Sequence, residues 1–478
     1  MMELASVALL MMIVCGAGAW VAGLLQDRDS ASIGLGRSWL LGCAVLSMAL
    51  HLPLAVDGHM THWSFGLAAA ACLFASLLFV GDCWKKRSIA RWGGWLVDLP
   101  WPGRLVAGAI LIAATSHAVQ TELTGYDARS AFALKARILY DTGDLTGEDF
   151  RDINRVNFNP TYPLLVPLIE AESYWCQASY QHPGLRLLFV GFLLSTVSVL
   201  AAELRRFAPA NAAACLAFLL LLTPMMIDWG EGAGLSGSAD LPLAAFVFAG
   251  TLDLFHFCQQ PTWRRAISAG LLFGAALMTK QEGLVWIGVT TITALGLFAA
   301  GKFGSALRGI RQAIPGAAVL GVAFGLHVLV HRGMPVSPYY PSYAAALTDM
   351  RWLAQIGDRP PVVAQYTLSA LVHTGSWSLV WPCILGALIL LRRGTVSLET
   401  KCWRATAAMI AVIYLTILTV TPLHLDYQLK TTFARLALHL YPLALLIMSE
   451  QVIASQYLDR LLAAGLQSAP ERSQSARL

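Results

Sequence analysis

A polar insert begins with the stretch GYDARSAFALKARILYDTGD, residues 125–144, and runs on to Pro167. The rest of the chain is almost continuously apolar, since 57% of its 478 residues are hydrophobic and only 13% are charged. A water-soluble protein of this size needs far more polar surface. Apolar runs of about twenty residues, the length that crosses a bilayer as a helix, recur along the whole chain. The sequence therefore predicts a membrane protein whose ionisable groups are concentrated beside its spans.

The predicted fold class is all-α: a polytopic bundle of transmembrane helices with a large outward loop that carries short interfacial helices. A membrane β-barrel would instead show alternating strands of about ten residues. The charged interruption at 280–283 allows two interpretations of its neighbourhood, either two short helices or one helix and a re-entrant segment. We expect about thirteen spans, near residues 4–25, 38–56, 62–82, 104–120, 184–203, 210–228, 238–258, 266–280, 283–300, 313–331, 366–391, 405–422 and 433–453.

Basic residues are concentrated in alternate loops, and this bias predicts the orientation in the membrane. The short loops at 57–61 and 229–237 contain no Lys or Arg. By the positive-inside rule, the basic loops face the cytoplasm. The N-terminus then lies outside, the C-terminus lies in the cytoplasm, and the 121–183 and 332–365 loops face the exterior. The predicted location is the inner or plasma membrane, crossed many times. The basic set includes Arg28, Arg37, Lys85, Lys86, Arg87, Arg91, Arg104, Arg205, Arg206, Arg264, Arg265, Lys302, Arg308, Arg311, Arg392, Arg393, Lys401 and Arg404.

Charge and cysteine content exclude several classes of function. The net charge of +5 comes from 33 basic and 28 acidic residues, and the loop bias accounts for the excess, so no nucleic-acid partner is expected. The nine cysteines form no CxxC pair, which supports neither a disulfide framework nor a zinc site. The absence of a GxxxxGK[ST] sequence argues against an ATP-driven pump.

Asp127 is the first candidate for chemistry, because it follows a span directly and opens a run, 127–140, that contains neither Gly nor Pro. That run predicts a short helix on the membrane surface. On such a helix Leu134 shares the face of Asp127, and Lys135 and Arg137 flank that face. A carboxylate beside cations can act as a general base. The alternative is structural, with Asp127 capping the first turn of the helix.

Two further polar residues lie at the outer ends of apolar runs. Tyr162 belongs to the proline-rich segment 159–167, which predicts an extended brace, and its side chain could line a polar pocket. Asp240 opens a span and could be an ordinary helix-start residue, favoured there by the helix dipole. The alternative to this commoner role is a second acid that faces the same outer cavity as Asp127, where Glu231 adds negative charge.

Four ionisable residues lie where the membrane is expected. Lys280 and Glu282 form either a structural pair or the lining of a cavity in which Lys280 meets an anionic lipid headgroup. Arg435 lies at the outer end of the last hairpin, and its planar guanidinium suits phosphate, although many such arginines only snorkel to headgroups. His439 lies one turn deeper on the same face and is more often a hydrogen-bonded core histidine than a proton carrier.

The order of these motifs resembles the polytopic glycosyltransferases of the GT-C fold. The nearest branch comprises the bacterial relatives of protein O-mannosyltransferase and of the lipid A aminoarabinose transferase. The resemblance covers roughly residues 104–455 and implies three parts: accessory spans and a linker in 1–103, a catalytic membrane domain in 104–455 with its outer loop 121–183, and a polar cytoplasmic tail in 456–478. It rests on Tyr126-Asp127, Lys135-Ala136-Arg137, Tyr162-Pro163-Leu164-Leu165-Val166-Pro167, Ala239-Asp240-Leu241-Pro242-Leu243, Thr279-Lys280-Gln281-Glu282-Gly283 and Arg435.

The resemblance also implies roles for individual residues. An acid in the first large outer loop is the catalytic base of that family, and here the matching residue is Asp127. The donor is a sugar on a polyprenyl monophosphate, for whose phosphate the candidates are Lys280, Arg435 and Lys135. Asp240 is the candidate for the second acid of the cavity. The other expected cavity-lining residues are Tyr162, Glu282, Arg137 and His439.

Two departures from the family pattern bear on metal binding. Asp127 is followed by Ala128, where relatives often carry a second acid, and residues 159–161 read Asn-Pro-Thr where relatives often read His-Pro-Asp. A single carboxylate is a poor site for a hard divalent cation. We therefore expect a reaction that needs no cofactor and depends weakly or not at all on metal.

The predicted activity is an inverting transfer of a hexose or pentose at the extracytoplasmic face. The expected partners are the polyprenyl-phosphate sugar, membrane lipids, and a glycan, lipid or protein acceptor. Three alternatives remain: a transporter or flippase of lipid-linked sugars, a polymerase or ligase of surface polysaccharide, and a structural membrane subunit. Transporters often contain paired broken helices, whereas this sequence has one candidate break, at 280–283.

Overall fold

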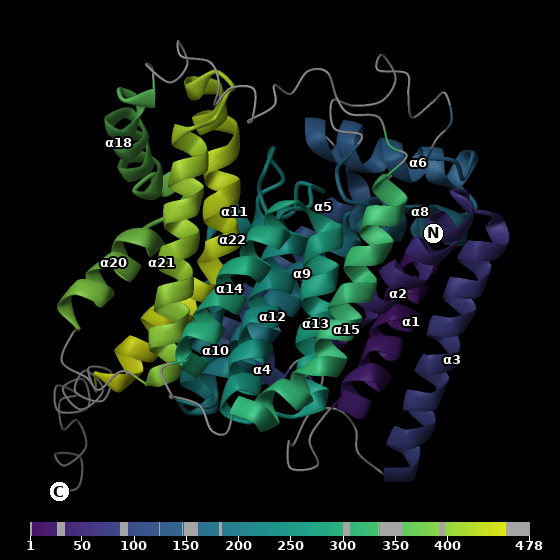
Figure 1. The fold of residues 1–478 in the computed structure, drawn as a ribbon, viewed down its shortest axis with the longest axis horizontal. Coiled ribbons are helices and arrows are strands. Elements are labelled where there is room, and N and C mark those ends of the chain that lie inside the picture. Colours follow the sequence, from purple (N-terminus) through teal and green to yellow (C-terminus); the bar gives the residue numbers. More distant parts are fainter. Residues whose placement is uncertain are drawn as a thin grey trace, which may run out of the picture.

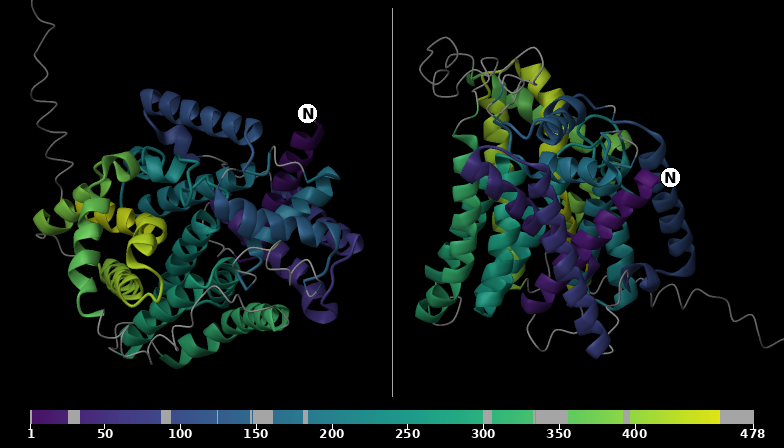
Figure 2. Two further views of the ribbon diagram at one scale, coloured as in Figure 1. Left: turned by 90° about the horizontal axis from the view of Figure 1, so that it is seen from above. Right: turned by 90° about the vertical axis from the view of Figure 1, so that its right-hand side faces the viewer.

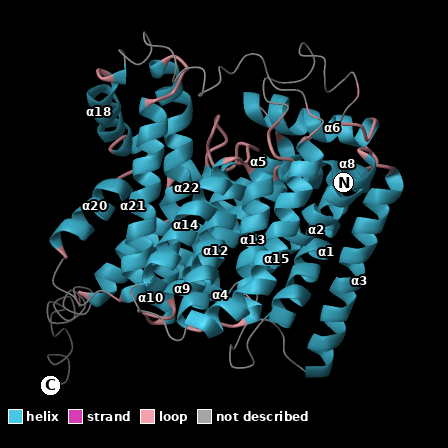
Figure 3. Cartoon of the chain, viewed as in Figure 1, coloured by secondary structure: helices cyan, strands magenta, loops and turns pink. Residues whose placement is uncertain are grey.

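The computed structural model is built from helices. It describes residues 2–25, 34–86, 94–123, 125–145, 147, 161–180, 184–299, 306–332, 334, 356–391 and 397–455. Within these ranges the regular secondary structure is helical throughout, with a single isolated β-bridge between His59 and Asp144 (Figure 3). The prediction of an all-α protein is confirmed for this part of the chain. The predicted tail, 456–478, lies outside the described residues.

The elements follow one another in chain order as labelled in Figure 1. They are α1 (Met2–Leu25), α2 (Leu35–Asp57), α3 (His62–Lys86), α4 (Gly94–Asp98), α5 (Trp101–Gln120), the π-helix η1 (Ala128–Ala133), α6 (Leu134–Asp141), α8 (Leu165–Gln177), α9 (Leu187–Leu204), α10 (Ala210–Phe218), α11 (Pro224–Ile227), α12 (Asp240–Gln259), α13 (Trp263–Thr279), α14 (Glu282–Ala299), α15 (Ala306–His331), α18 (Arg359–Leu371), α19 (Thr374–Trp377), α20 (Val380–Leu390), α21 (Leu398–Thr419) and α22 (Leu425–Ala454).

Among the described residues, nine helices are long and apolar enough to cross a membrane. They belong to α1, α2, α3, α5, α9, α12, α15, α21 and α22, and each overlaps a predicted span. The protein is therefore a membrane protein by the length and composition of its helices. The total of about thirteen spans, the kind of membrane and the orientation of the termini stay predictions.

Two of the predicted spans are broken into shorter helices. Residues 210–228 form α10 and α11, because Pro224 keeps the preceding Thr223 in an extended conformation, with φ −91° and ψ 117°. Residues 366–391 contain the end of α18, then α19 and α20. The breaks fall at residues 372–373 and 378–379, and Ser378 in the second break has a φ of 51°. An apolar run predicts that a segment is buried or lipid-facing, but it does not predict that its backbone is continuous.

The centre of the bundle is formed by α9 and α12. In their spanning windows 83% of α9 and 89% of α12 are buried, against 17% of α5. α12 packs against α9, α13, α14 and α22, and these helices stand side by side in the middle of Figure 1. Asp240 is the first residue of α12, so a carboxylate lies at the end of the most enclosed helix.

Short helices cover the end of the bundle where α12 and α22 begin. The π-helix η1 and α6 run across this end, and α8 packs beneath them against α1, α2, α3 and α6 (Figures 1 and 2). These elements belong to the predicted outer loop, 121–183. Residues 148–160 and 181–183 of that loop, which include Asn159 and Pro160, are outside the described residues.

The first three helices share the core of the bundle with the later ones. α2 packs against α9, α13 and α15, and the hydroxyl of its Ser47 lies 3.9 Å from the sulfur of Met278 in α13. α1 packs against α2, α3 and α8. The functional division of the chain at residue 103 stays a prediction, although the packing is continuous across it.

Candidate functional site

Asp127 lies inside a helix that begins one residue before it. Its backbone is helical, with φ −62° and ψ −41°, and its side chain makes no capping hydrogen bond. The carboxylate of Glu231 takes that role instead, because it accepts hydrogen bonds from the backbone amides of Tyr126 and Asp127. The alternative in which Asp127 caps its own helix is therefore wrong, and its carboxylate is available for other contacts.

The turn after Asp127 is a π-helix. The amide of Leu134 donates to the carbonyl of Arg129, five residues earlier, rather than four as in an α-helix. Each extra residue in a turn rotates the remainder of the helix by roughly 100° relative to a regular helix. The predicted alignment of Leu134, Lys135 and Arg137 around Asp127 assumed a regular helix, so it does not describe this segment.

Arg435 of α22 joins two acids. Its Nη1 lies 2.6 Å from Oδ2 of Asp127, and its Nε lies 2.9 Å from Oδ2 of Asp240. Its third nitrogen, Nη2, is buried and has no hydrogen-bond partner in the part of the chain that the structure describes. The guanidinium thus holds residues of three distant segments together and keeps one donor unused.

Asp240 is the centre of a buried polar cluster. Its Oδ1 lies 2.7 Å from Nζ of Lys280 and 3.1 Å from Nε2 of His439, and its Oδ2 accepts a hydrogen bond from Ser238 at 2.9 Å. The side chain of Asp240 is 0% exposed, whereas that of Asp127 is 21% exposed. A buried carboxylate needs such partners, because burial without them is costly. The two acids therefore differ in access: one is open to solvent and the other is enclosed.

His439 belongs to a chain of hydrogen bonds that runs into the bundle. Its Nδ1 lies 3.2 Å from the hydroxyl of Tyr414, which accepts a hydrogen bond of 2.8 Å from Nε1 of Trp286. The indole can only donate, so the tyrosine hydroxyl donates to Nδ1 and the Nε2–H donates to Asp240. His439 is thus the hydrogen-bonded core histidine that was the commoner expectation, and it orients Asp240.

The helix break at 280–283 supplies the second cation of the cluster. α13 ends at Thr279 and α14 begins at Glu282, so of the two interpretations of this region the structure has two helices. Lys280 between them is extended, with φ −157° and ψ 154°, and its Nζ also lies 3.2 Å from Oε1 of Glu282. The lysine therefore spans an enclosed acid, Asp240, and a partly exposed one.

Tyr162 faces this cluster from the outer loop. Burial raises the pKa of its hydroxyl, and the charges of Lys280, Glu282, Arg435 and Asp127 all act on it, which places its ring beside them. Its carbonyl accepts a hydrogen bond of 3.3 Å from Nζ of Lys135. We name the residues Asp127, Tyr162, Asp240, Lys280, Glu282, Arg435 and His439 the acid–arginine cluster.

Lys135 donates a hydrogen bond to a carbonyl of the outer loop, and Arg137 forms an ion pair with an acid outside this cluster. Lys135 is buried, and burial lowers its pKa to about 7, so it carries its charge only in part at neutral pH. Arg137 lies 3.4 Å from the carboxylate of Asp141 and over the ring of Tyr180, 4.1 Å from its centroid. The prediction that Arg137 lines the cavity has no support in these contacts.

Sequence alone does not identify the supporting residues of the cluster. Ser238, Tyr414 and Trp286 are uncharged residues in apolar or small-residue surroundings, and nothing in their neighbourhoods distinguishes them from packing residues. Glu231 stands out only as an acid between two glycines, a pattern that suggests a close-packed loop. Charged residues at membrane depth are a strong signal, whereas their neutral hydrogen-bond partners give none.

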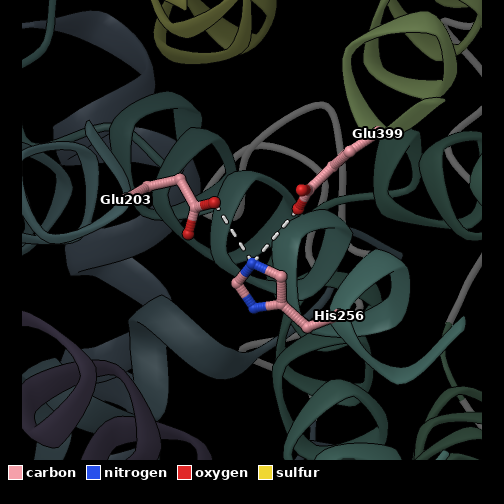
Figure 4. Close-up of side chains that lie close together, drawn as sticks. All are labelled: Glu203, His256 and Glu399. Atoms are coloured by element: carbon pink, nitrogen blue, oxygen red, sulfur yellow. Dashed lines mark hydrogen bonds and ion pairs between the residues drawn. The ribbon is translucent and has the colours of Figure 1, made fainter. Parts of the chain in front are cut away.

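A second cluster of ionisable residues lies at the opposite end of α12 (Figure 4). Nε2 of His256 lies 3.2 Å from Glu203 of α9 and 3.4 Å from Glu399 of α21, and these three side chains are spaced as metal ligands could be. However, Nη1 of Arg206 contacts all three of these ligand atoms. The guanidinium occupies the centre of the set, so we interpret it as an ion-pair network that joins three helices.

Comparison with models of protein families and with curated proteins finds no match to this chain. The resemblance to membrane glycosyltransferases therefore rests on the sequence motifs named above alone.

Proposed function

We propose that the protein transfers a sugar from a polyprenyl-phosphate donor to an acceptor hydroxyl at the extracytoplasmic end of the bundle. The observation that carries this proposal is the bridge from Asp127 through Arg435 to Asp240. It combines a partly exposed carboxylate with a buried cation whose Nη2 has no partner among the described residues, near the end of the bundle where α12 and α22 begin. A lipid-linked phosphate would need a cation at a site that water and acyl chains can both reach.

In this proposal Asp127 is the base. It takes the proton of the acceptor hydroxyl while that oxygen bonds to the anomeric carbon, and the bond from that carbon to the phosphate oxygen breaks on the opposite face. The electron pair of the broken bond leaves with the polyprenyl phosphate. The configuration at the anomeric carbon is inverted, because a single displacement occurs. Asp127 is 21% exposed, which allows an acceptor to approach it.

Arg435 is the best supported of the three candidates for the donor phosphate. Its buried Nη2 has no partner among the residues that the structure describes, and a phosphate oxygen would supply one. Lys280 is already shared by Asp240 and Glu282, so its contribution to phosphate binding would be weaker. Lys135 has a pKa lowered to about 7 by burial and would bind phosphate mainly in its protonated form.

The same geometry supports a reaction without a divalent metal. Asp127 and Asp240 are the two acids that could share an ion, but Arg435 lies between them and binds each through a different nitrogen. A metal that bridged the two carboxylates would have to displace a charged guanidinium from a buried site. Arginine thus supplies the positive charge that a metal ion supplies elsewhere.

A transfer assay in detergent tests the proposal. The purified protein is mixed with synthetic polyprenyl phosphates that carry a radiolabelled hexose or pentose, and washed membranes from source cells that lack the gene supply the acceptor. We expect labelled acceptor and free polyprenyl phosphate with at least one donor. Detergent leaves no two compartments, so this result could not arise from transport alone.

The matched variants are Asp127→Asn and Asp426→Asn. Asp426 is an exposed acid of α22 that pairs with Lys430, outside the acid–arginine cluster. We expect Asp127→Asn to lower the transfer rate by about 10²- to 10⁴-fold, because it removes the base, and Asp426→Asn to leave it unchanged. A folded Asp127→Asn protein that transfers sugar at the wild-type rate would falsify the proposal.

A further inference from the structure

We infer that Glu231 is a positioning residue for Asp127, and this inference rests on the proposed function. Glu231 lies in the loop between α11 and α12, and its Oε1 is 3.2 Å from the backbone amide of Asp127, which lies 104 positions away in sequence. Its Oε2 accepts a hydrogen bond from the backbone amide of Tyr126. A single carboxylate thus holds the first turn of the helix that carries the base.

The first amides of a helix have no partners within it, and they usually bond to a side chain just before the helix. Here the residue before the helix is Gly125, which has no side chain, and the acid comes from a distant loop. An acid at this end is also favoured by the helix dipole. Because the cap is distant, the position of Asp127 depends on the position of the loop.

Two glycines show how closely the loop approaches both partners of the Asp127–Arg435 ion pair. A Cβ at Gly125 would lie 2.8 Å from Oε2 of Glu231, and a Cβ at Gly232 would lie 2.7 Å from Cγ of Arg435. Gly232 also has a φ of 75°, which other residues rarely adopt. The tripeptide of Gly230, Glu231 and Gly232 therefore contacts the base on one side and its arginine on the other.

The surroundings of the Glu231 carboxylate fit a positioning role better than the role of a second base. Burial and the charge of Asp127 raise its pKa, while Arg435 and the two backbone amides act in the opposite direction. Both of its oxygens accept backbone hydrogen bonds, so taking up a proton would weaken the cap that they form. The stacked rings of Trp229 and His117, 4.1 Å apart, fix the same loop against α5.

Substitution of Glu231 tests this role through two independent measurements. The first is hydrogen–deuterium exchange of peptides covering residues 125–134, which needs no substrate. We expect Glu231→Ala to lose protection at the first turn and Glu231→Gln to keep part of it, because the amide oxygen of Gln accepts one of the two bonds. Asp228→Ala is the matched control: Asp228 is an exposed acid in the same loop and accepts the amide of Trp229.

The second measurement is the kinetics of sugar transfer, with the labelled polyprenyl-phosphate sugar that is active in the transfer assay as the donor. We expect Glu231→Ala to lower kcat by about 10- to 100-fold with an unchanged KM for the donor, since a misplaced base slows the chemical step. Glu231→Gln should recover part of kcat, and Asp228→Ala should match the wild type.

Three outcomes would overturn the inference. The first is wild-type protection and kcat in Glu231→Ala. The second is full protection with no activity in Glu231→Gln, since the charge and not the cap would then be needed. The third is equal effects of Asp228→Ala and Glu231→Ala. If Asp127→Asn stays active, the proposed function fails, and the exchange measurement still decides whether Glu231 caps this helix.

Discussion

The two acids joined by Arg435 differ in what surrounds them, and this difference separates stability from chemistry. Asp240 is fully buried and has four partners, namely Lys280, Arg435, His439 and Ser238. Asp127 has Arg435 and is partly exposed. An acid at the centre of a buried network cannot change its charge without cost to the whole network, whereas one at its edge can.

We therefore predict that Asp240→Asn lowers stability more than Asp127→Asn. Removing the buried charge leaves Lys280 and Arg435 with one carboxylate each, at a cost of about 3 kcal/mol, against about 1 kcal/mol for the partly exposed acid. Thermal unfolding in detergent at one fixed scan rate measures the difference. Equal shifts of Tm in the two variants would contradict this assignment.

Much of the site was predictable at this scale, because charged residues near apolar runs are rare and informative. Six charged or titratable residues that the sequence singled out are joined by ion pairs, and their roles stay predictions: Asp127, Asp240, Lys280, Glu282, Arg435 and His439. The sequence did not predict which cation pairs with which acid. That pairing depends on how α22 and α12 are rotated, and rotation follows from packing along their entire lengths.

At the level of elements, the π-helix η1 sets the direction of Asp127 relative to α6. Such turns arise when one residue is added to an α-helix, and they are common at functional sites. No propensity scale distinguishes the sequence ARSAFA from an ordinary helix, so the turn was not predictable. The cap from Glu231 could not be predicted from the sequence either. Capping patterns are recognised among residues a few positions apart, and this cap comes from a distant segment.

Deleting Arg129 tests the importance of η1. Its side chain is exposed, and its loss would convert the wide turn into a regular one, which rotates Asp127 by roughly 100° relative to α6. We expect transfer to fall by about 100-fold or more, because Asp127 would no longer meet Arg435. Arg129→Ala keeps the length of the turn and should remain active. Wild-type transfer by the deletion variant would rule out this role of the π-helix.

The buried acids of α8 predict how stability depends on pH. Both oxygens of Glu172 lack hydrogen-bond partners within the described ranges, and burial raises its pKa from 4.5 to about 8. The folded protein keeps this group neutral up to about pH 8, whereas the unfolded chain ionises near pH 4.5. Stability should therefore fall as the pH rises from 4.5 to 8.

Glu172→Gln should raise the stability at pH 8 by on the order of 2 kcal/mol and change it little at pH 5. The amide cannot ionise, so the variant avoids the cost of keeping a carboxyl group protonated at a pH where the unfolded chain releases that proton. Thermal unfolding at the two pH values measures the effect, with Glu122→Gln at an exposed position as the control. A gain at pH 5 as large as that at pH 8 would show that packing, not ionisation, is responsible.

At the level of the whole molecule, hydropathy predicted where the apolar segments lie, but it did not predict whether each segment is one continuous helix. In the described part of the chain, the nine helices that are long and apolar enough to span lie where apolar runs predict them, because the length of a membrane span is set by the bilayer. The runs at 210–228 and 366–391 are broken, since burial against neighbours can satisfy an apolar segment of any shape. Hydropathy also left open how deeply each span is buried.

Orientation is the property of the whole molecule on which the proposed function depends. The positive-inside rule predicts that the end with Asp127 faces away from the cytoplasm. Alkaline phosphatase fused after residue 145 should be active, and the same reporter fused after residue 208 should be inactive. The opposite pattern would place Asp127 in the cytosol, where the proposed donor is not presented.

Helix α12 forms ion pairs with neighbouring helices near both of its ends. At one end, Asp240 binds Arg435 of α22 and Lys280 at the junction of α13 and α14. At the other end, roughly 24 Å further along the helix, His256 contacts Glu203 of α9 and Glu399 of α21. Between them Asp253 holds Arg37 of α2 at 2.5 Å. A helix held by ion pairs at both ends can neither slide nor turn without breaking several of them at once. If the proposed lipid-linked donor binds between helices, we expect the movement that admits its tail at less buried peripheral helices such as α5, whose spanning window is only 17% buried.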